Sequence, residues 1–394
     1  MTELLIVGPP DGGLATLQRN VSASLSDWNV LLCPHSDAAL ERIRQRPADV
    51  VLASLPSADD CESLFAWVAA ENPGAIRLAL FDSPPATVIG AHQVVANRSN
   101  HDDLLPVIQA AAEVSATIAK RPGLQKVMCR FQDVPSPPML YFDIREQLDS
   151  ATGNAATLAQ IAGRDPALVA RTLRIANSGF YARPRSVGDL TEAIGLIGVD
   201  TLLNLVLAAS LYKGMPPPGL RLEALWQHAM EVSSLAAQIV RIEGGSREQI
   251  NHGVIAGLLH DIGLLVLLQN EASKYQPLWR DSAGDEAELA VMEQAAFGAT
   301  HGEVGALILK MWSLPPAVVN AVAHSHDSVQ APATDAGPLD LVGRAVMAAE
   351  WLQDTDHALD EDNLPAALAD VGQPSLQRWV EARDELIPAR AGAA

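Results

Sequence analysis

The sequence "AGLLHDIG" (256–263) places a histidine directly before an aspartate in a strongly apolar stretch. Residues Val254–Leu268 are otherwise almost wholly aliphatic, and a charge buried there is costly unless it is paired or bound to a metal. Imidazole and carboxylate groups are ligands for Fe, Mn and Zn, and such metals can activate water. We therefore interpret His260 and Asp261 either as metal ligands or as a polar pair that holds packed helices together.

A second stretch whose residues could bind a ligand is basic, although the chain as a whole is acidic. Its arginines form the cluster Arg171, Arg174, Arg183 and Arg185. Arginine suits bidentate contacts to carboxylates and phosphates. The cluster predicts either contact with an anion, on a partner or a phosphate-bearing ligand, or ion pairs with neighbouring acidic residues of the chain itself.

Composition limits the class of protein. The 394 residues are 48% hydrophobic and 19% charged, with a net charge of −20, which indicates a folded chain of two or three domains. Such a chain has no basic face for nucleic acid or an anionic membrane. Three scattered cysteines fit a reducing compartment, and no segment has the form of a signal peptide or membrane span. We expect a cytoplasmic protein that binds neither nucleic acid nor membrane.

The elements of the first 120 residues alternate in type. Short aliphatic runs separated by amphipathic stretches predict strands at 4–8, 29–33, 49–54, 76–81 and 92–96. Strand–helix alternation is typical of a parallel sheet covered on both faces. We predict a flavodoxin- or CheY-like doubly wound sheet of five strands over residues 1–120.

This half resembles a response-regulator receiver domain, a family that carries acidic residues after its first strand, a phosphoacceptor aspartate after the third and a lysine after the fifth. Here Gly8 and Pro9 follow the first strand, and Ser54 stands at the phosphoacceptor position, shortly before Pro56. The segment "VANRSN" after the fifth strand has no lysine. Clustered carboxylates are what hold Mg²⁺ for phosphoryl transfer. We expect a pseudo-receiver without phosphorylation that serves as a dimerisation or docking surface.

The rest of the chain has a helical period. Pro and Gly in residues 121–138 predict a linker, residues 139–355 repeat apolar residues at steps of three and four, and residues 356–394 predict a helical tail. The fold class is therefore multidomain, α/β followed by all-α.

Several blocks occur in order in this helical region: "DPALVARTLRIANSGFY", "LTEAIGLIGVDTLLNLVL", "LWQHAMEVSSLAA", "AGLLHDIG" and "HGEVGALILKMWSLP". Together they look like an HDOD domain, a helical output module related to the HD phosphohydrolases, over about residues 139–330. The resemblance implies a divalent metal site made from His228, His260, Asp261 and a late acid, here Glu350 in place of aspartate. Additional ligands in two-metal relatives correspond to His301 and to His324 or His326. Residues two apart do not share a helix face, so His324 and His326 cannot both point at one site unless the helix ends there. The alternative is that both lie at a helix terminus on the surface, where histidine suits the C-terminal dipole.

The chain also departs from catalytic relatives, which usually carry "IGK" after the His–Asp pair. Leu264 stands at the lysine position, and no Gly-Tyr-Pro block follows. The resemblance therefore implies a non-catalytic signalling protein that binds other signalling proteins, including a second copy of itself, with a vestigial His–Asp pair. One alternative is a metal-dependent phosphohydrolase acting on a nucleotide or cyclic dinucleotide. Another is a nucleotide sensor that uses the arginine cluster.

Overall fold

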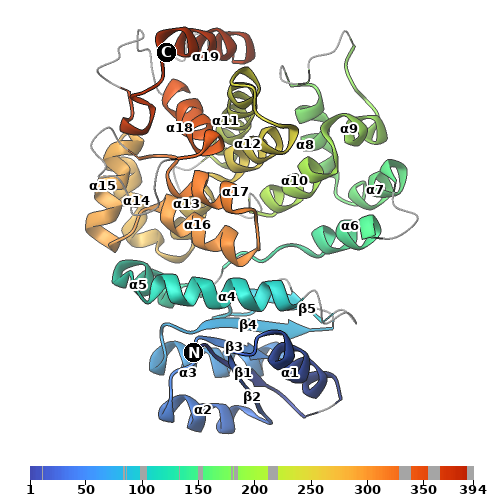
Figure 1. Cartoon of the computed structure of the whole chain (residues 1–394), viewed down its shortest axis with the longest axis vertical. Coiled ribbons are helices and arrows are strands. Elements are labelled where there is room, and N and C mark those ends of the chain that lie inside the picture. Colours follow the sequence, from blue (N-terminus) through green and yellow to red (C-terminus); the bar gives the residue numbers. More distant parts are fainter. Residues whose placement is uncertain are drawn as a thin grey trace.

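The computed structural model describes residues 1–10, 12–82, 85, 87–97, 104–132, 134–149, 154–178, 181, 185–211, 221–327, 339–353 and 364–387. An N-terminal α/β domain and a larger helical domain are stacked along the long axis of the molecule (Figure 1). Helices α4 (Leu104–Ile118) and α5 (Pro122–Arg130) lie between the sheet and the helical domain. Both expected fold classes are present, in the expected order.

The α/β domain is built on one parallel sheet. Its strands are β1 (Glu3–Val7), β2 (Asn29–Cys33), β3 (Val50–Ala53), β4 (Ile76–Phe81) and β5 (Gln93–Ala96), in the spatial order β2-β1-β3-β4-β5. All four neighbouring pairs are parallel. Each strand begins and ends within one residue of its predicted aliphatic run, and the order is that of flavodoxin-like sheets.

The helices of this domain are α1 (Gly12–Ser24), α2 (Ser36–Gln45), α3 (Ala58–Glu71) and α4 (Leu104–Ile118). Within the described part of the chain, no helix joins β4 to β5. The segment predicted as a linker instead contains a helix, α5 (Pro122–Arg130), and it runs beside β5. The Val94 amide donates to the Ser136 hydroxyl (2.8 Å), and His92 Nε2 lies 3.1 Å from the Met128 carbonyl. The chain thus covers the β5 edge of the sheet as it leaves the domain.

The second domain is helical throughout its described residues. Its helices are α6 (Met139–Asp149), α7 (Ala155–Ala162), α8 (Pro166–Ala176), α9 (Leu190–Ile197), α10 (Val199–Leu211), α11 (Leu222–Ile242), α12 (Arg247–Leu259), α13 (Ile262–Asn270), α14 (Ala272–Asp281), α15 (Glu286–Phe297), α16 (His301–Met311), α17 (Pro316–Ala323), α18 (Leu341–Gln353) and α19 (Gln373–Leu386), with a short 3-10 turn at Ala366–Leu368. The stretch 190–211, which reads as one apolar helix, breaks at Gly198, whose φ of +85° favours glycine.

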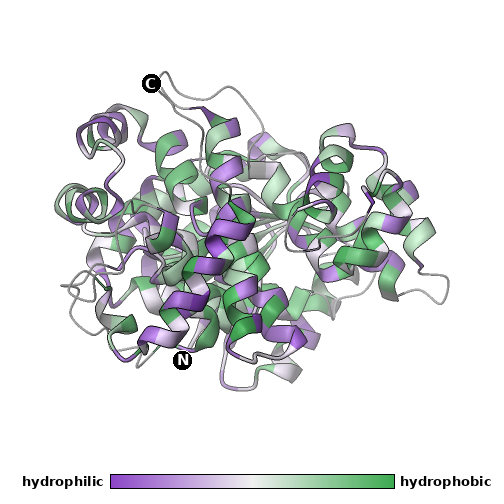
Figure 2. Cartoon of the chain, turned by 90° about the horizontal axis from the view of Figure 1, so that it is seen from above, coloured by the Kyte–Doolittle hydropathy of each residue, from purple (hydrophilic) through white to green (hydrophobic). Residues whose placement is uncertain are grey.

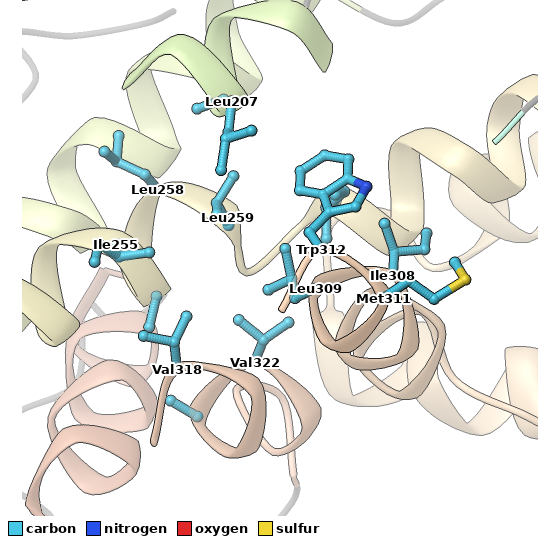
Figure 3. Close-up of a cluster of buried hydrophobic side chains, with 14 of the residues drawn as sticks. Leu207, Ile255, Leu258, Leu259, Ile308, Leu309, Met311, Trp312, Val318 and Val322 are labelled. Carbon is cyan, nitrogen blue, oxygen red and sulfur yellow. The ribbon is translucent and has the colours of Figure 1, made fainter. Parts of the chain in front are cut away.

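An apolar core joins the helices that carry the site described below. In Figure 3 the side chains of α10, α12, α16 and α17 meet, among them Leu207, Leu259, Leu309 and Val322, all buried. Seen from above, hydrophobic (green) and hydrophilic (purple) residues alternate along most helices (Figure 2). The apolar core holds α12, α16 and α17 at fixed relative positions.

Hydrophobicity alone would let one long helical stretch cross a membrane. Residues Arg247–Asn270, which comprise α12 and α13, pass that test by length and composition, but 78% of the tested window is buried inside the protein. The bent pair Leu190–Ile197 and Val199–Ser210 passes only if both helices count as one span, and they meet at 107°. Packing in the helical core accounts for the apolar character of α12 and α13.

Candidate metal centre

The His–Asp pair lies at a break in what sequence periodicity predicts to be one continuous helix. Helix α12 ends at Leu259 and α13 begins at Ile262, so His260 and Asp261 occupy the junction. His260 Nδ1 lies 2.8 Å from the Gly257 carbonyl. Because a carbonyl oxygen only accepts, Nδ1 carries a proton, and Nε2 is the nitrogen that faces the neighbouring side chains. The junction therefore presents the nitrogen that a metal would bind.

Two glycines let neighbouring helices approach this junction closely. A Cβ at Gly263 would lie 1.9 Å from the His301 carbonyl oxygen, and one at Gly257 would lie 2.5 Å from Ser233 Cα. Backbone contact therefore brings α13 against α16, which begins at His301, and α12 against α11, which carries His228.

Four side chains from three parts of the fold form what we term the first half-site: His228, His260, Asp261 and Glu350. His228 Nε2 lies 3.2 Å from both His260 Nε2 and Glu350 Oε1. His260 Nε2 lies 3.3 Å from Asp261 Oδ2 and 3.4 Å from Glu350 Oε2. Ligands of a tetrahedral ion with bonds of about 2.1 Å are roughly 3.4 Å apart, so these spacings suit one shared ion. Glutamate in place of aspartate still reaches the cluster.

The second half-site comprises Asp261, His301 and His326. The other carboxylate oxygen of Asp261, Oδ1, lies 3.3 Å from His326 Nε2 and 3.8 Å from His301 Nε2. Asp261 thus faces one set of ligands with each oxygen, as a carboxylate that bridges two metals does. Helix α17 ends at Ala323, and beyond it only His326 points at the cluster, while His324 pairs with Asp327 (2.7 Å).

Buried polar atoms without hydrogen bonds converge at this place. Among the described residues they include Asp261 Oδ1, Glu286 Oε2, His301 Nε2, Glu350 Oε2 and both ring nitrogens of His326. Leaving each such atom unsatisfied costs about 1–3 kcal/mol. Two groups of His and Asp side chains have the spacing that can hold an ion, and they share Asp261. The residues therefore fit a pair of divalent cations.

A buried network orients His301. Both oxygens of the Glu293 carboxylate lie 2.9 Å from His301 Nδ1, and one also accepts from the His301 backbone amide (2.8 Å). The Tyr275 hydroxyl donates to the same carboxylate, and Glu293 and Tyr275 are fully buried. Such a partner fixes the tautomer of a ligating histidine and raises its basicity.

Sequence reasoning missed Glu286, Glu293 and Tyr275. The available signal is the spacing of Glu286 and Glu293, which are seven residues apart and so project from one face of α15. That spacing is equally common on solvent-exposed helices, and nothing in the sequence indicated that this face is buried.

Without metal, the acidic groups of the centre favour protonated histidines. Burial alone would lower the pKa of His228, but the Glu350 carboxylate raises it to about 10. Burial likewise opposes the rise in the pKa of His301 to about 10, which Glu293 causes. In return, His228 and His260 overcome the effect of burial and lower the pKa of Glu350 to about 2. A metal would replace these protons.

The arginine cluster is engaged within the chain. Arg174 pairs with Glu223 (2.8 Å) and Arg185 with Glu192 (2.9 Å). Arg171 lies over the Trp226 ring at 4.1 Å and donates to the Ala209 carbonyl (3.2 Å). Arg183 lies outside the described residues. These contacts favour the alternative in which the arginines serve the fold.

The receiver-like pocket lies at the ends of β3 and β4, where Ser54, Asp82 and Asn97 line a cavity of about 380 Å³. Ser54 directly follows β3, and its amide donates to the Val7 carbonyl (2.8 Å). A Cβ at Gly8 would lie 2.4 Å from the Ser54 carbonyl oxygen, so an acidic side chain does not fit there without a backbone shift. After β5, Asn97 donates to Asp82 (2.8 Å).

Comparison with known proteins identifies the helical region. Residues 134–328 match the family model of the HDOD domain. An uncharacterized protein of Treponema pallidum (strain Nichols) is 23% identical over 203 residues, which are 52% of this chain but only 39% of that protein. A crystal structure of an HDOD domain protein of unknown function from Geobacter sulfurreducens, 22% identical, covers 68% of this chain and 89% of its own, with a TM-score of 0.50.

The MmoQ response regulator from Methylococcus capsulatus str. Bath is 24% identical and covers 61% of this chain and 95% of its own, with a TM-score of 0.34.

The HDOD match begins at residue 134 rather than at the expected 139, and it ends at 328, before Glu350. Residues 134–328 are thus an HDOD domain, which follows a five-stranded parallel sheet of the receiver-like type.

Proposed function

We propose that this chain is a signal-transduction regulator whose HDOD domain holds a carboxylate-bridged pair of divalent metal ions. The HDOD domain supports the signalling role. The observation that carries the metal centre is the convergence around Asp261 of buried imidazole and carboxylate atoms, several of which have no hydrogen-bond partner.

In this proposal His228, His260, Asp261 and Glu350 would hold one ion, and Asp261, His301 and His326 would hold the other. Imidazole and carboxylate donors suit Fe, Mn or Zn. When bound, such ions can polarise an oxygen or activate water. The residues themselves lie on α11, on the α12–α13 junction, on α16, after α17 and on α18, so a bound pair would tie these elements together.

The regulator is non-catalytic in this proposal. His260 and His301 are fully buried and the Asp261 side chain is 3% exposed, so little of the centre meets a dissolved substrate. Leu264 is buried at the position where catalytic relatives carry lysine. The α/β domain acts as a pseudo-receiver in this proposal, since Ser54 stands at the phosphoacceptor position and Gly8 follows β1, where receivers carry acidic residues. Its partners are signalling proteins, including a second copy of this chain.

One observation favours a second function, a metal-dependent phosphohydrolase for a nucleotide or cyclic dinucleotide. The side chain of His228 is 24% exposed, so water reaches the first half-site. The set of donors is also complete for two ions.

Elemental analysis of the purified full chain tests the metal centre. We expect close to two equivalents of Fe, Mn or Zn in the wild type and loss of both in the His260→Ala, Asp261→Ala double variant. The matched control is His324→Ala, because His324 is a neighbouring histidine that pairs outside the cluster. A metal-free wild-type protein, or equal metal content in all three, would contradict the proposal. Hydrolysis of a cyclic dinucleotide by the loaded wild type would instead favour the phosphohydrolase.

A further inference from the structure

Glu286, the first residue of α15, is a mostly buried carboxylate that belongs to neither half-site. Its side chain is 18% exposed, and its Oε2 lies 4.0 Å from His326 Nδ1. That oxygen is buried and has no hydrogen-bond partner among the described residues. A buried carboxylate oxygen without a hydrogen bond destabilises the fold. This cost indicates that Glu286 has a functional role beside the proposed metal ligands.

The charge of Glu286 acts on both half-sites. Burial and the Glu350 carboxylate have the larger effects on the pKa of His228, and Glu286 adds to its rise. Burial and Glu293 dominate the pKa of His301, and Glu286 again adds to its rise. By distance, Glu286 lies beside His326 of the second half-site.

The number of carboxylates matches the charge of two divalent ions. Among the described residues, the cluster comprises four carboxylates, on Asp261, Glu286, Glu293 and Glu350, and four imidazoles that are neutral when they bind metal. Two divalent cations with four carboxylates give a net charge of zero. Without Glu286 the centre would carry one positive charge, and such charge is what draws a phosphate to a metal pair.

We infer that Glu286 is a specificity-determining residue that keeps phosphate anions, and with them nucleotides, from the metal pair. A like charge placed against the wrong ligand is a general means of discrimination. The inference rests on the proposed two-metal centre, and it leaves water and small neutral ligands as the species that can approach the ions.

Two variants and inorganic phosphate test this role. The full-length protein, its Glu286→Gln and Glu286→Ala variants and a Glu288→Gln control are loaded with Mn²⁺, and phosphate is titrated into each by calorimetry. Glu288 lies in the same first turn of α15 but is exposed. We expect phosphate to bind both Glu286 variants at least about tenfold more tightly than wild type or control, the effect of one charge several ångströms away at an effective dielectric of about 20.

The outcomes separate the two proposals, provided that Mn²⁺ content is measured in every sample. Two equivalents of Mn²⁺ in all proteins with equal phosphate affinity would overturn the role of Glu286 and leave the metal centre standing. Loss of one Mn²⁺ in Glu286→Gln would show a ligand rather than a barrier, which also overturns the inference. A wild type that binds no Mn²⁺ would overturn the centre itself, and the inference with it.

Discussion

His301 is oriented by a carboxylate that comes eight residues earlier in the chain. Because both oxygens of Glu293 face His301 Nδ1, the ring is held with Nε2 toward Asp261. Replacing Glu293 with glutamine turns one of its two acceptor oxygens into an NH₂ group, and this donor would face the N–H groups of His301. We expect Glu293→Gln to weaken Mn²⁺ binding about 10- to 100-fold, the usual cost of losing such a partner.

Competition with a fluorescent chelator would measure the affinity of this variant, and circular dichroism would verify its fold. The exposed Glu288→Gln change on the same helix is the control and should leave the affinity unchanged. Wild-type affinity in Glu293→Gln would show that the Glu293 contact does not support the second half-site.

The stability of the metal-free protein should depend on pH through the His228–Glu350 pair. The pKa of His228 rises from 6.5 to about 10 on folding, so its stabilisation is complete below pH 6.5 and is lost as pH rises toward 10. The pKa of Glu350 falls from 4.5 to about 2, so its stabilisation is complete above pH 4.5 and is lost as pH falls toward 2. The pair therefore stabilises the metal-free chain most between pH 4.5 and 6.5.

Above pH 6.5 the stability of the metal-free protein should fall, whereas the affinity for metal should rise, because ions displace protons from the histidines. We expect the thermal midpoint of the EDTA-treated protein to fall between pH 6.5 and 9, while the increase produced by added Mn²⁺ grows. A His228→Gln variant should lose the part of this pH dependence that His228 contributes, while the part due to His301, whose pKa is also raised to about 10, remains. Parallel curves for treated and loaded protein would contradict the assignment.

At the scale of elements, the crossing of α13 and α16 determines whether the two half-sites meet. A Cβ at Gly263 would lie 1.9 Å from the His301 carbonyl oxygen, and backbone cannot yield as a flexible side chain does. We expect Gly263→Ala to destabilise the protein by about 1–3 kcal/mol, the usual range for overpacking, and to reduce its metal content.

The matched control is Gly195→Ala, in the exposed middle of α9, where a Cβ meets nothing within 4 Å. That change should stabilise the protein by about 0.5–1 kcal/mol, because alanine suits a helix interior better than glycine. Urea unfolding monitored by circular dichroism measures both. Equal effects from the two glycines would contradict a close backbone contact between α13 and α16.

Elements with a strong local pattern were predictable from the sequence. The five strands are short aliphatic runs, and the helices that separate the first four of them indicate that these strands are parallel. The break at His260–Asp261 was not predictable, because apolar residues continue through it at helical spacing. The helix α5 was also missed, since its Pro122 and Gly123 are typical of a linker, although proline also suits the first turn of a helix.

At the scale of the whole molecule, the centre draws on residues from 228 to 350 that only the tertiary fold brings together. Resemblance to a family supplied His228, His260, Asp261, Glu350, His301 and His326, and the structure places all six in one cluster. It supplied neither Glu286 nor Glu293, because burial of their helix face depends on how α15 packs. Residue spacing predicted that His324 and His326 do not both face the site, but it could not show which of the two does.

The two domains meet beside the second half-site, which allows one to affect the other. Helix α5 of the α/β side lies against the turn before α16, where a Cβ at Gly123 would lie 1.9 Å from the Gly298 carbonyl oxygen. Arg121 forms an ion pair with Glu303, whose carboxylate also caps α16. His301 is the first residue of α16, so a shift of α5 would also move His301, a proposed metal ligand.

We expect Gly123→Ala to weaken Mn²⁺ binding about 2- to 30-fold, the range over which residues that contact no ligand alter coupling between sites. Gly188→Ala, in an open loop where a Cβ meets nothing within 4 Å, is the control. Coupling is reciprocal, so Mn²⁺ should also slow hydrogen exchange in α5 of the wild type, and less so in Gly123→Ala. If Mn²⁺ protects α16 but leaves α5 unchanged, the domains are adjacent without being coupled, and signals between them must take another route.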